Sequence, residues 1–362
     1  IFIFAKIRTN NKRKSRVLAL DTQKMETQKI KTAVVILNWN GKSWLEKFLP
    51  NVIQHSNDAE VIIADNNSSD DSIKFLEENH PNIRIIQNDG NYGYAKGYNL
   101  ALKQIDAQYF VLLNSDIEVT KDWISPIISL MDSDKTISTC QPKILDYNNK
   151  NRFEYAGASG GYIDKFGYPF CRGRIFDFLE EDKGQYNDAT EVFWATGACL
   201  FVRASHFWEV GGLDSDFFAH QEEIDLCWRL KNKGYKIMVE PKSVVYHVGG
   251  GTLNVGSPLK THLNFRNNLY MIFKNLPLSY LFIIIPIRLV LDGIAAITFL
   301  GNKKGISHLF AVMKAHFSFY FEIPKLITKR RNISQKCSLT GKTNYSILVK
   351  NKLKGIKNFS DL

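Results

Sequence analysis

The chain has 362 residues, 44% of them hydrophobic, which is enough for one large folded domain with appended segments. Its formal net charge of +11 indicates an anionic partner, but the excess lies in residues 1–24 and 325–357. The middle of the chain is nearly balanced in charge. This argues against a nucleic-acid-binding core and favours basic ends that contact an anionic membrane surface.

From residue 33 onward, short apolar runs alternate with stretches of helical period. The runs are continuously apolar, as in parallel strands that are covered on both faces. This order predicts an α/β fold whose mostly parallel sheet has helices on both faces, with ligands beyond the carboxyl ends of the strands. In chain order the predicted elements are strand 33–37, helix 43–55 with Ser43 as N-cap, strand 61–64, helix 71–79, strand 83–87, helix 94–105 and strand 109–113.

The second half of the chain is less regular. Residues 142–190 are rich in Gly, Tyr, Asn and charge, and we interpret them as loops and short hairpins that shape an acceptor site. The later predicted elements are helix 121–132, strand 136–141, a strand-like stretch 191–203 interrupted at 196–198, helix 222–232 closed by Gly234, and strand 236–240.

Residues 278–300 form a strongly apolar run that contains Pro286, Arg288 and Asp292. A membrane-spanning helix needs about 20 apolar residues, and each central charge costs roughly 2.5–3.5 kcal/mol on insertion. Arg288 and Asp292 are four residues apart and can pair. Because the flanks are basic, we interpret the run as an interfacial or re-entrant helix beside anionic lipid. A buried core helix and a true span are the alternatives.

Outside these elements, the five cysteines are scattered and never occur in Cys-x-x-Cys spacing. This argues against a zinc site or a disulfide framework and favours reduced thiols in the cytoplasm. Residues 1–30 are interpreted as a basic leader, either disordered or upstream of the true start, because Met25 begins a plausible start. The apolar run 1–5 is too short for the core of a signal peptide, so we expect no secretion.

Polar side chains follow three of the predicted strands, in the segments 38–41, 65–68 and 114–116. The carboxyl ends of parallel strands meet at one edge of a sheet, so these segments are expected to line one crevice. A nucleotide diphosphate bound there needs its charge neutralised, which a hard divalent cation with few protein ligands can do. Asp116 is the first-choice ligand, and Asn114 points the same way and can reach a ribose or a metal-bound water. The alternative for Asn114–Asp116 is ordinary turn chemistry.

The other strand ends suggest contacts to the nucleoside. Asp65 can accept from a pyrimidine N–H or a ribose hydroxyl, or it can cap the following helix; we expect ligand binding for Asp65 and capping for Asp70. Trp39 or Asn40 is expected to line the base pocket, with simple packing as the alternative for Trp39. The segment 91–99 opens a helix, and its glycines and N-terminus favour phosphate.

Two further features complete the predicted site. Glu222 and Glu223 begin a helix, where a carboxylate is expected to stay ionised and act as a general base; stabilisation of the first helical turn is the alternative. Asp225 is expected to be structural and to pair with Arg229. His247 lies in a Gly-rich turn and is expected to complete the metal shell as a neutral imidazole, although a lone histidine is more often structural.

At these residues the chain resembles family-2 glycosyltransferases of the GT-A fold, in their rhamnosyltransferase-like, non-processive branch. This is the Rossmann-like fold of nucleotide-diphospho-sugar transferases. The matching segments are 34–41, 65–70, 91–99, 113–116, 196–198, 211–218, 222–226 and His247. The processive members carry a Gln-x-x-Arg-Trp motif, which is missing here, so repeated chain extension is not expected.

The resemblance implies a single in-line displacement with inversion at the anomeric carbon, and Mg²⁺ or Mn²⁺ as cofactor. It places Asp65 on the nucleoside, Asp116 and His247 on the metal, and Glu223 as base. Two residues depart from the family pattern: Asn114 replaces the first Asp of Asp-x-Asp, and Glu223 replaces the Asp of a Glu-Asp pair. Glu222 and Glu223 can therefore exchange roles. The full set of expected nucleotide-sugar contacts is Leu37, Trp39, Asn40, Asp65, Asn67, Gly93, Asn99 and Asn114, with Trp194 and Gly197 on the acceptor side.

We therefore expect a GT-A domain over 31–270, an apolar membrane-associated helical segment over 271–320 and a basic tail over 321–362. The expected activity is transfer of one sugar from a dTDP-rhamnose or UDP-hexose type of donor to a glycan or lipid-linked glycan, in cell-surface polysaccharide synthesis. The expected location is peripheral or monotopic at the inner face of the plasma membrane. The rival functions are a nucleotidyltransferase and a non-catalytic sugar-nucleotide-binding protein of the same fold.

Overall fold

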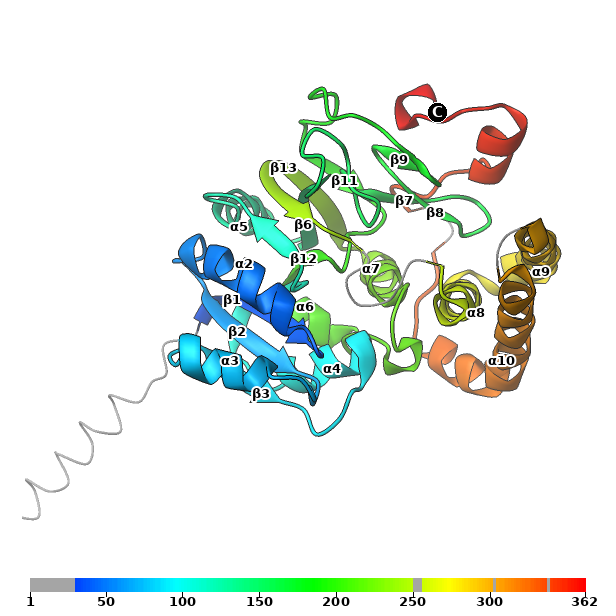
Figure 1. Ribbon diagram of the computed structural model, residues 1–362. Coiled ribbons are helices and arrows are strands. Elements are labelled where there is room, and N and C mark those ends of the chain that lie inside the picture. Colours follow the sequence, from blue (N-terminus) through cyan, green and yellow to red (C-terminus); the bar gives the residue numbers. More distant parts are fainter. Residues whose placement is uncertain (1–29, 250–255, 302–303, 337–338) are drawn as a thin grey trace, which may run out of the picture.

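A nine-stranded mixed sheet forms the centre of the molecule (Figure 1). The computed structural model describes residues 30–249, 256–301, 304–336 and 339–362, so most of the predicted leader lies outside the described residues. The strand order is β11-β13-β6-β12-β4-β1-β2-β3, with β5 paired to β13. The strands are β1 (Ile30–Asn38), β2 (Glu60–Asp65), β3 (Arg84–Gln87), β4 (Ala107–Leu113), β5 (Ile117–Val119), β6 (Ile137–Asp146), β11 (Thr190–Val192), β12 (Cys199–Arg203) and β13 (Lys236–His247).

The continuously apolar runs of the sequence predict parallel strands, and these strands form the parallel part of the sheet. β1, β2, β3 and β4 pair in parallel, and β6 pairs in parallel with β13. Three strands pair antiparallel with their neighbours: β12 pairs with β4 and β6, and β11 and β5 each pair with β13. The prediction of an α/β fold with a mostly parallel sheet is therefore confirmed, with short antiparallel strands inserted in the second half.

Helices cover both faces of the sheet because alternate residues of the same strands enter two different cores. Val35 and Leu112 belong to one core, whereas Val34 and Leu113 belong to the other. Helices α4, α6 and α7 pack on the first face, and α2, α3 and α5 on the second. These helices are α2 (Lys42–Gln54), α3 (Ser72–Asn79), α4 (Gly93–Leu102), α5 (Ser125–Ser133), α6 (Ala204–Glu209) and α7 (Glu222–Lys233).

Most element bounds differ from the prediction by a few residues. The N-cap of α2 is Gly41 instead of Ser43, and α5 begins at Ser125 because the preceding residues form a turn. The stretch 191–203 splits into β11 and β12, as its interruption indicated. The largest difference is in β13, which continues to His247 and so carries that residue to the end of a strand.

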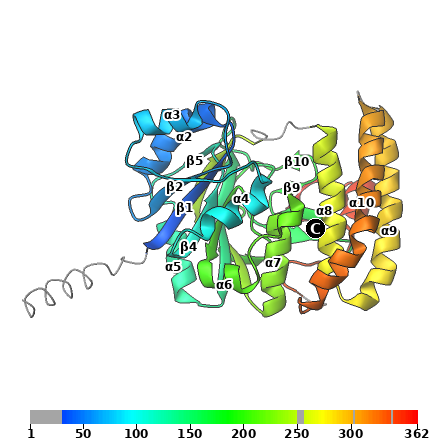
Figure 2. The same ribbon diagram turned by 90° about the horizontal axis from the view of Figure 1, so that it is seen from below.

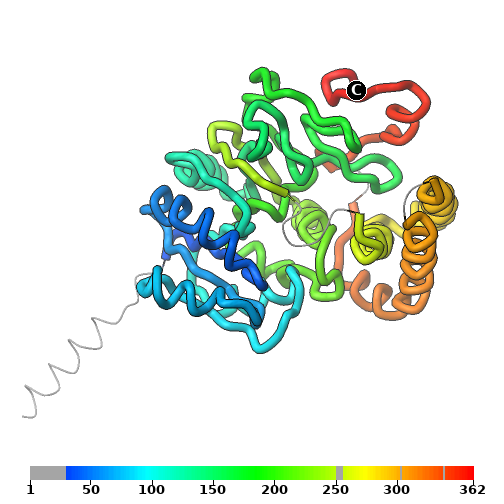
Figure 3. Tube along the Cα trace, in the orientation of Figure 1, coloured from blue at the N-terminus to red at the C-terminus, as the bar shows by residue number. Residues whose placement is uncertain are grey.

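A small second sheet and the end of the chain form one subdomain. The sheet consists of β7 (Gly161–Ile163), β8 (Pro169–Cys171), β9 (Arg174–Ile175) and β10 (Phe178–Leu179), within the region predicted as loops and hairpins. Ile163 bridges to Lys342, and the Phe359 ring lies 4.9 Å from that of Tyr162. The red end of the chain accordingly returns to the green segment in Figure 3. The predicted basic tail therefore includes ordered residues that pack on this sheet.

Three helices form a layer beside α7 (Figure 2). They are α8 (Pro258–Asn275), α9 (Leu278–Thr298) and α10 (Gly305–Arg331). The sequence predicts an apolar helical segment over 271–320, with its strongest apolar run at 278–300, in and just beyond α9; the structure divides this segment among the end of α8, α9 and the first half of α10. Among the described residues, the stretch Leu278–Gly301 is the one segment that by length and apolar composition could cross a membrane.

The two charged residues of α9 face inward, toward the segment that contains Phe166 and Tyr168. Arg288 is 2% exposed and Asp292 is fully buried; their side chains pair at 3.2 Å. The Arg288 guanidinium also donates to the carbonyl oxygen of Phe166 at 2.9 Å and lies 3.8 Å from the centre of the Tyr168 ring. The predicted pairing of Arg288 with Asp292 is confirmed, and it anchors α9 to the loop after β7.

Candidate active site

The ends of β1 and β2 form one polar cluster. Asn38 and Asp65 are partners in the strand register, and the Asn38 amide donates to Asp65 Oδ1 at 2.9 Å. Asp65 also accepts from the backbone N–H and the hydroxyl of Ser68, at 2.8 and 2.6 Å. Asp65 thus organises the turn that follows it and does not cap α3, which begins at Ser72. The N-cap of α3 is Asp71; Asp70, expected as the cap, precedes it and accepts from the N–H and hydroxyl of Ser72.

The residues around this cluster leave an open polar surface. Asn40 adopts a left-handed backbone with φ 50°, and its side-chain oxygen accepts from the Ser69 N–H at 2.7 Å. The Trp39 side chain is 42% exposed and Asn67 is exposed. Leu37 is half-buried at the end of β1, next to the Tyr98 hydroxyl. An exposed indole beside fixed polar groups is suited to stacking on a flat base.

The start of α4 does not offer free amides to a phosphate. The N–H groups of Tyr94 and Ala95 both point to the carbonyl oxygen of Phe218, at 2.7 and 3.4 Å. Gly93 has φ +68°, and a Cβ there would lie 2.5 Å from that same oxygen. The expectation that the N-terminus of this helix favours phosphate therefore does not fit the structure, because the Phe218 loop already occupies it.

Asn99 also has a partner inside the protein. Its side-chain amide donates to the Leu213 carbonyl at 2.7 Å, and its oxygen accepts from the Leu213 N–H at 3.0 Å. These two bonds hold the loop after α6 against α4. The structure thus gives Asn99 a role in positioning a loop.

Asp116 and His247 meet beyond the end of β4. The chain turns back after Asp116 into β5, which pairs with the end of β13 so that His247 lies opposite Ile117. His247 Nε2 is 3.2 Å from Asp116 Oδ1 and 3.4 Å from the Asn114 amide. Both Asp116 and His247 are buried. The predicted metal pair, residues 131 positions apart in sequence, is therefore brought together.

Burial and neighbouring charges shift the pKa values of both Asp116 and His247. Burial alone would lower the His247 pKa, but the carboxylates of Glu154 and Asp116 raise it to about 10. Burial alone would raise the Asp116 pKa, but the charge of His247 lowers it below its usual value. Without a cation, this site therefore holds a charged imidazole between two carboxylates, which is the arrangement that a divalent ion would replace.

The pair fits a divalent cation. Oxygen and imidazole ligands bind such ions at about 2.0–2.2 Å, so two adjacent ligand atoms lie about 3 Å apart. The 3.2 Å separation of Asp116 Oδ1 and His247 Nε2 matches this spacing. Within the described part of the chain, no three Asp, Glu, His or Cys side chains are placed to hold an ion together. An ion held by Asp116 and His247 would keep most of its positions for phosphate and water.

Glu222 and Glu223 differ in their access to solvent. Glu222 is 4% exposed and its Oε2 has no hydrogen-bond partner among the described residues, whereas Glu223 is half-buried. Burial raises the pKa of Glu223 to about 7, even though backbone N–H groups at the start of α7 lower it. Burial and the charge of Glu223 raise the pKa of Glu222 well above its usual value. Burial thus opposes the helix N-terminus at both residues and raises their pKa values, with Glu223 at about 7.

The segment 196–198 connects Glu223 to the metal pair. The Tyr94 hydroxyl donates to the Gly197 carbonyl at 2.6 Å, and the Asn114 N–H donates to the Ala198 carbonyl at 2.9 Å. A Cβ on Gly197 would lie 2.8 Å from the Tyr94 hydroxyl and 3.7 Å from the Glu223 Cβ. Gly197 therefore makes room for the Tyr94 hydroxyl of α4 and lies in contact with Glu223 at the start of α7.

Trp194, expected on the acceptor side, is a core residue. It is buried, its indole N–H donates to the Tyr162 carbonyl at 2.9 Å, and its ring packs against Gly161.

The predicted structural pair Asp225–Arg229 is confirmed: the Arg229 guanidinium lies 2.8 Å from the Asp225 carboxylate. The Lys274 ammonium of α8 also contacts the Asp225 carboxylate, at 2.9 Å.

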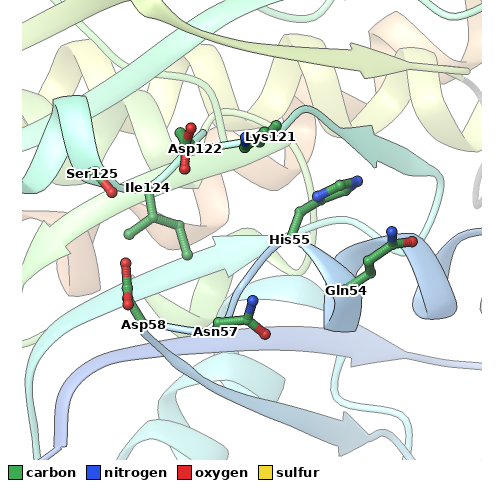
Figure 4. Close-up of a pocket in the computed structure, with 8 residues that line it drawn as sticks. All are labelled: Gln54, His55, Asn57, Asp58, Lys121, Asp122, Ile124 and Ser125. Atoms are coloured by element: carbon green, nitrogen blue, oxygen red, sulfur yellow. The ribbon is translucent and has the colours of Figure 1, made fainter.

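One clear cavity lies elsewhere. It has a volume of about 420 Å³ and is lined by residues from the end of α2 and the turn before α5, including His55, Asp58 and Lys121 (Figure 4). The predicted site adjoins the opposite end of α2, since Lys42 donates to Asp70 there. The 13 residues of α2 span about 20 Å. The cavity is thus remote from the strand-end cluster.

Glu154 is a residue that the sequence does not single out. It lies in the irregular stretch after β6, and its Oε2 is 3.2 Å from His247 Nδ1. No motif or spacing marks it, and the only sequence signal is that a carboxylate occurs in an aromatic and Gly-rich stretch.

Comparison with known proteins identifies related sequences. Residues 33–211 match the model for glycosyl transferase family 2. The hexosyltransferase Agl10 of low-salt glycan biosynthesis in Haloferax volcanii is 23% identical over 240 residues, 65% of this chain and 73% of that protein. The N-acetylglucosaminyl-diphospho-decaprenol L-rhamnosyltransferase of Mycobacterium tuberculosis is 25% identical, over 59% of this chain and 75% of its own. The Escherichia coli rhamnosyltransferase WbbL is 25% identical, over 59% and 82%.

Two solved structures share the fold. GalNAc-T7, crystallised with UDP, GalNAc and Mn²⁺, has a TM-score of 0.54 at 17% identity; the match covers 69% of this chain but only half of that one. The mannosyltransferase PcManGT from Pyrobaculum calidifontis, in complex with GDP-Man and Mn²⁺, has a TM-score of 0.50 at 13% identity, over 82% and 89% of the two chains.

Proposed function

We propose that this chain, a family-2 glycosyltransferase of the GT-A fold, moves a single sugar from a nucleotide-diphosphate donor to a glycan or lipid-linked glycan, with inversion at the anomeric carbon. The observation that carries the proposal is the convergence at the end of β4. The Asp116–His247 pair lies there, Asn114 donates its N–H to the Ala198 carbonyl, and the neighbouring Gly197 lies beside Glu223.

Asp116 and His247 would hold Mg²⁺ or Mn²⁺, with Asn114 beside them. When bound, the ion supplies positive charge that stabilises the departing nucleoside diphosphate. The exposed face of Trp39 and the Asp65–Asn38 pair would hold the base and ribose. The acceptor hydroxyl approaches from the opposite side of the sugar, where Glu223 removes its proton as the new bond forms.

Glu223 is a better base than Glu222. A base must reach the acceptor, and Glu223 is half-buried whereas Glu222 is enclosed. A pKa of about 7 is also well matched to proton removal near neutral pH. We assign to Glu222 a supporting role: it stays protonated and therefore places no second negative charge beside Glu223.

The activities of two relatives support the donor and acceptor classes. One acts as a rhamnosyltransferase on a diphospho-decaprenol-linked sugar, another as a hexosyltransferase in glycan biosynthesis. On this basis we assign a dTDP-rhamnose or UDP-hexose type of donor and a role in cell-surface polysaccharide synthesis. The rival nucleotidyltransferase would need a basic, Gly-rich triphosphate loop after β1, where residues 39–42 supply one Gly and one Lys.

The test is transfer by the purified protein. UDP-, dTDP- and GDP-sugars would be supplied with Mn²⁺ and a short polyprenyl-diphosphate-linked sugar, and the products separated by mass. We expect one sugar to be added from one donor class, with release of the nucleoside diphosphate. Release of pyrophosphate would instead support the nucleotidyltransferase, and donor binding without any transfer or hydrolysis would support the non-catalytic protein.

We further propose that the protein docks on the inner face of the plasma membrane through α9 and α10. The charges of α9 are turned inward, so its outer face carries no charged side chain and is mostly apolar. Exposed residues of α10 recur at three- and four-residue spacing and extend this face. The exposed basic residues Lys304 and Lys314 match anionic headgroups. The large exposed apolar residues of the two helices include Phe282, Ile283, Val290, Ile294, Ile297, Ile306, Phe310, Phe317 and Phe321.

Co-flotation with vesicles of phosphatidylethanolamine and phosphatidylglycerol tests this docking. Changing Phe282, Ile283 and Phe321 together to Ser should weaken vesicle binding more than tenfold, since burial of each large apolar side chain contributes about 1.5–3 kcal/mol. Ile53→Ser, at an exposed position on α2, is the matched control and should float like the wild type. Unchanged flotation of the triple variant would exclude this face as the docking surface.

A further inference from the structure

Glu154 is held rigidly next to the metal pair. Its backbone N–H donates to the Ile144 carbonyl of β6 at 3.1 Å, and its neighbour Phe153 is fully buried. Its side chain is buried as well, and Oε2 accepts from the Ala156 N–H at 2.6 Å. A Cβ on Gly249 would lie 2.9 Å from Oε1, so the glycine after β13 makes room for this carboxylate. The carboxylate therefore has a fixed position.

Glu154 and Asp116 contact different nitrogens of the same imidazole. Oε2 of Glu154 is 3.2 Å from Nδ1 of His247, and Oδ1 of Asp116 is 3.2 Å from Nε2. An ion shared by Nε2 and Asp116 lies on the far side of the ring from Glu154. This arrangement excludes Glu154 as a third ligand of that ion and leaves it as the partner of the other ring nitrogen.

Nδ1 of His247 is buried and has no aligned hydrogen-bond partner among the described residues, and Oε2 of Glu154 at 3.2 Å is an acceptor within reach. We infer that Glu154 is a positioning residue for the cation site: a small rotation of the ring on metal binding lets Oε2 accept the Nδ1–H, which selects the tautomer with a free Nε2 lone pair and fixes the orientation of the ring. A metal-binding imidazole commonly donates its second N–H to a carboxylate in this way, and loss of such a partner weakens metal binding by about 10–100-fold. The inference rests on the proposed function, because it requires that His247 binds the ion.

The direct test is Mn²⁺ affinity in the presence of UDP, measured by the electron paramagnetic resonance signal of free Mn²⁺ without any turnover. Glu154→Ala should weaken Mn²⁺ binding by about 10–100-fold, and Glu154→Gln, which keeps an acceptor oxygen, should lose less. Glu118→Ala is the matched control. Glu118 lies opposite Tyr246 in the β5–β13 pair and binds Lys150, so its loss should leave Mn²⁺ affinity unchanged.

A double-mutant cycle separates positioning from a merely structural role. If Glu154 acts through His247, then Glu154→Ala should weaken Mn²⁺ binding no further in a His247→Ala background. An equal loss in both backgrounds, or wild-type affinity in the Glu154→Ala protein, would overturn the inference. If the alanine variant does not fold, Glu154→Met, which fills a similar volume without an acceptor oxygen, is carried through the same cycle and decides the question.

The wild-type protein distinguishes this failure from failure of the proposed function. If wild type and His247→Ala bind Mn²⁺ equally, the cation site itself is misassigned. If His247→Ala loses Mn²⁺ and Glu154→Ala does not, the cation site stands and only the positioning role of Glu154 is wrong.

Discussion

Glu223→Gln should lower turnover by at least about 10²–10⁴-fold, because an amide cannot take the proton of the acceptor hydroxyl. The change keeps the size of the side chain and lies away from the Asp65–Asn38 cluster, so donor affinity should stay within about twofold. Initial rates at saturating donor and acceptor give the first quantity, and titration with the nucleoside diphosphate gives the second. Wild-type turnover in this variant would rule out Glu223 as the base.

The pH dependence of kcat/KM is a second test of Glu223 as the base. Since burial raises the Glu223 pKa to about 7, the active carboxylate form is lost below neutral pH, and wild-type kcat/KM should fall as pH drops through 7.

Glu222→Gln is the matched control for Glu223→Gln. It removes the adjacent buried carboxyl while leaving the proposed base, so turnover should persist. Burial raises the pKa of Glu222 on folding, so the folded protein keeps a proton that the unfolded chain releases, and the resulting loss of stability grows as pH rises above the usual glutamate pKa of 4.5. The Glu222→Gln protein should therefore lose less stability than wild type as pH rises from about 4.5 through neutral. Loss of turnover in Glu222→Gln, with turnover retained in Glu223→Gln, would reverse the two roles.

Asp116→Ala should abolish the dependence of donor binding on metal and reduce transfer by at least about a hundredfold. The variant removes one of the two protein ligands and leaves His247 as the only one, so the ion loses its charged anchor. Titration of UDP with and without Mn²⁺ measures the effect: Mn²⁺ should tighten UDP binding to the wild type but not to the variant.

Asp146→Ala provides the matched control for Asp116→Ala. Asp146 is the register partner of His247 on β6, but its carboxylate accepts from the backbone of Asn148 and Asn149. Mn²⁺ should still tighten UDP binding to this variant. Equal responses to Mn²⁺ in wild type and Asp116→Ala would contradict the metal assignment.

The sheet and its polar edge are predictable because their signals are local. Continuous apolar runs give β1, β2 and β4, and polar residues directly after each run, such as Asp65, lie at one edge once the strands are parallel. The contact between Asp116 and His247 is harder to predict from the sequence. It depends on the reversal of the chain into β5 and on the full length of β13, neither of which has a strong local pattern.

The remaining differences arise from tertiary contacts. Phe218 occupies the start of α4, and Leu213 takes the side chain of Asn99, although both lie more than a hundred residues away. The ionisation of Glu223 was expected from its helix start alone, whereas the enclosure that raises its pKa comes from other segments. Glu154 has no sequence pattern, since it reaches His247 only through the fold of an irregular stretch. Helix α10 packs against α8 and α9 in one layer. Its outward apolar face can be recognised only when the position of α9 beside it is known.

The most direct measurement is anomalous diffraction at the manganese edge from crystals grown with UDP and Mn²⁺. A single strong peak bonded to Asp116 and His247, with the diphosphate on the same ion and the uridine beside Asp65, is the predicted result. A manganese ion bound elsewhere, or a nucleotide distant from the ends of β1 and β4, would show that these scattered side chains do not form one donor site.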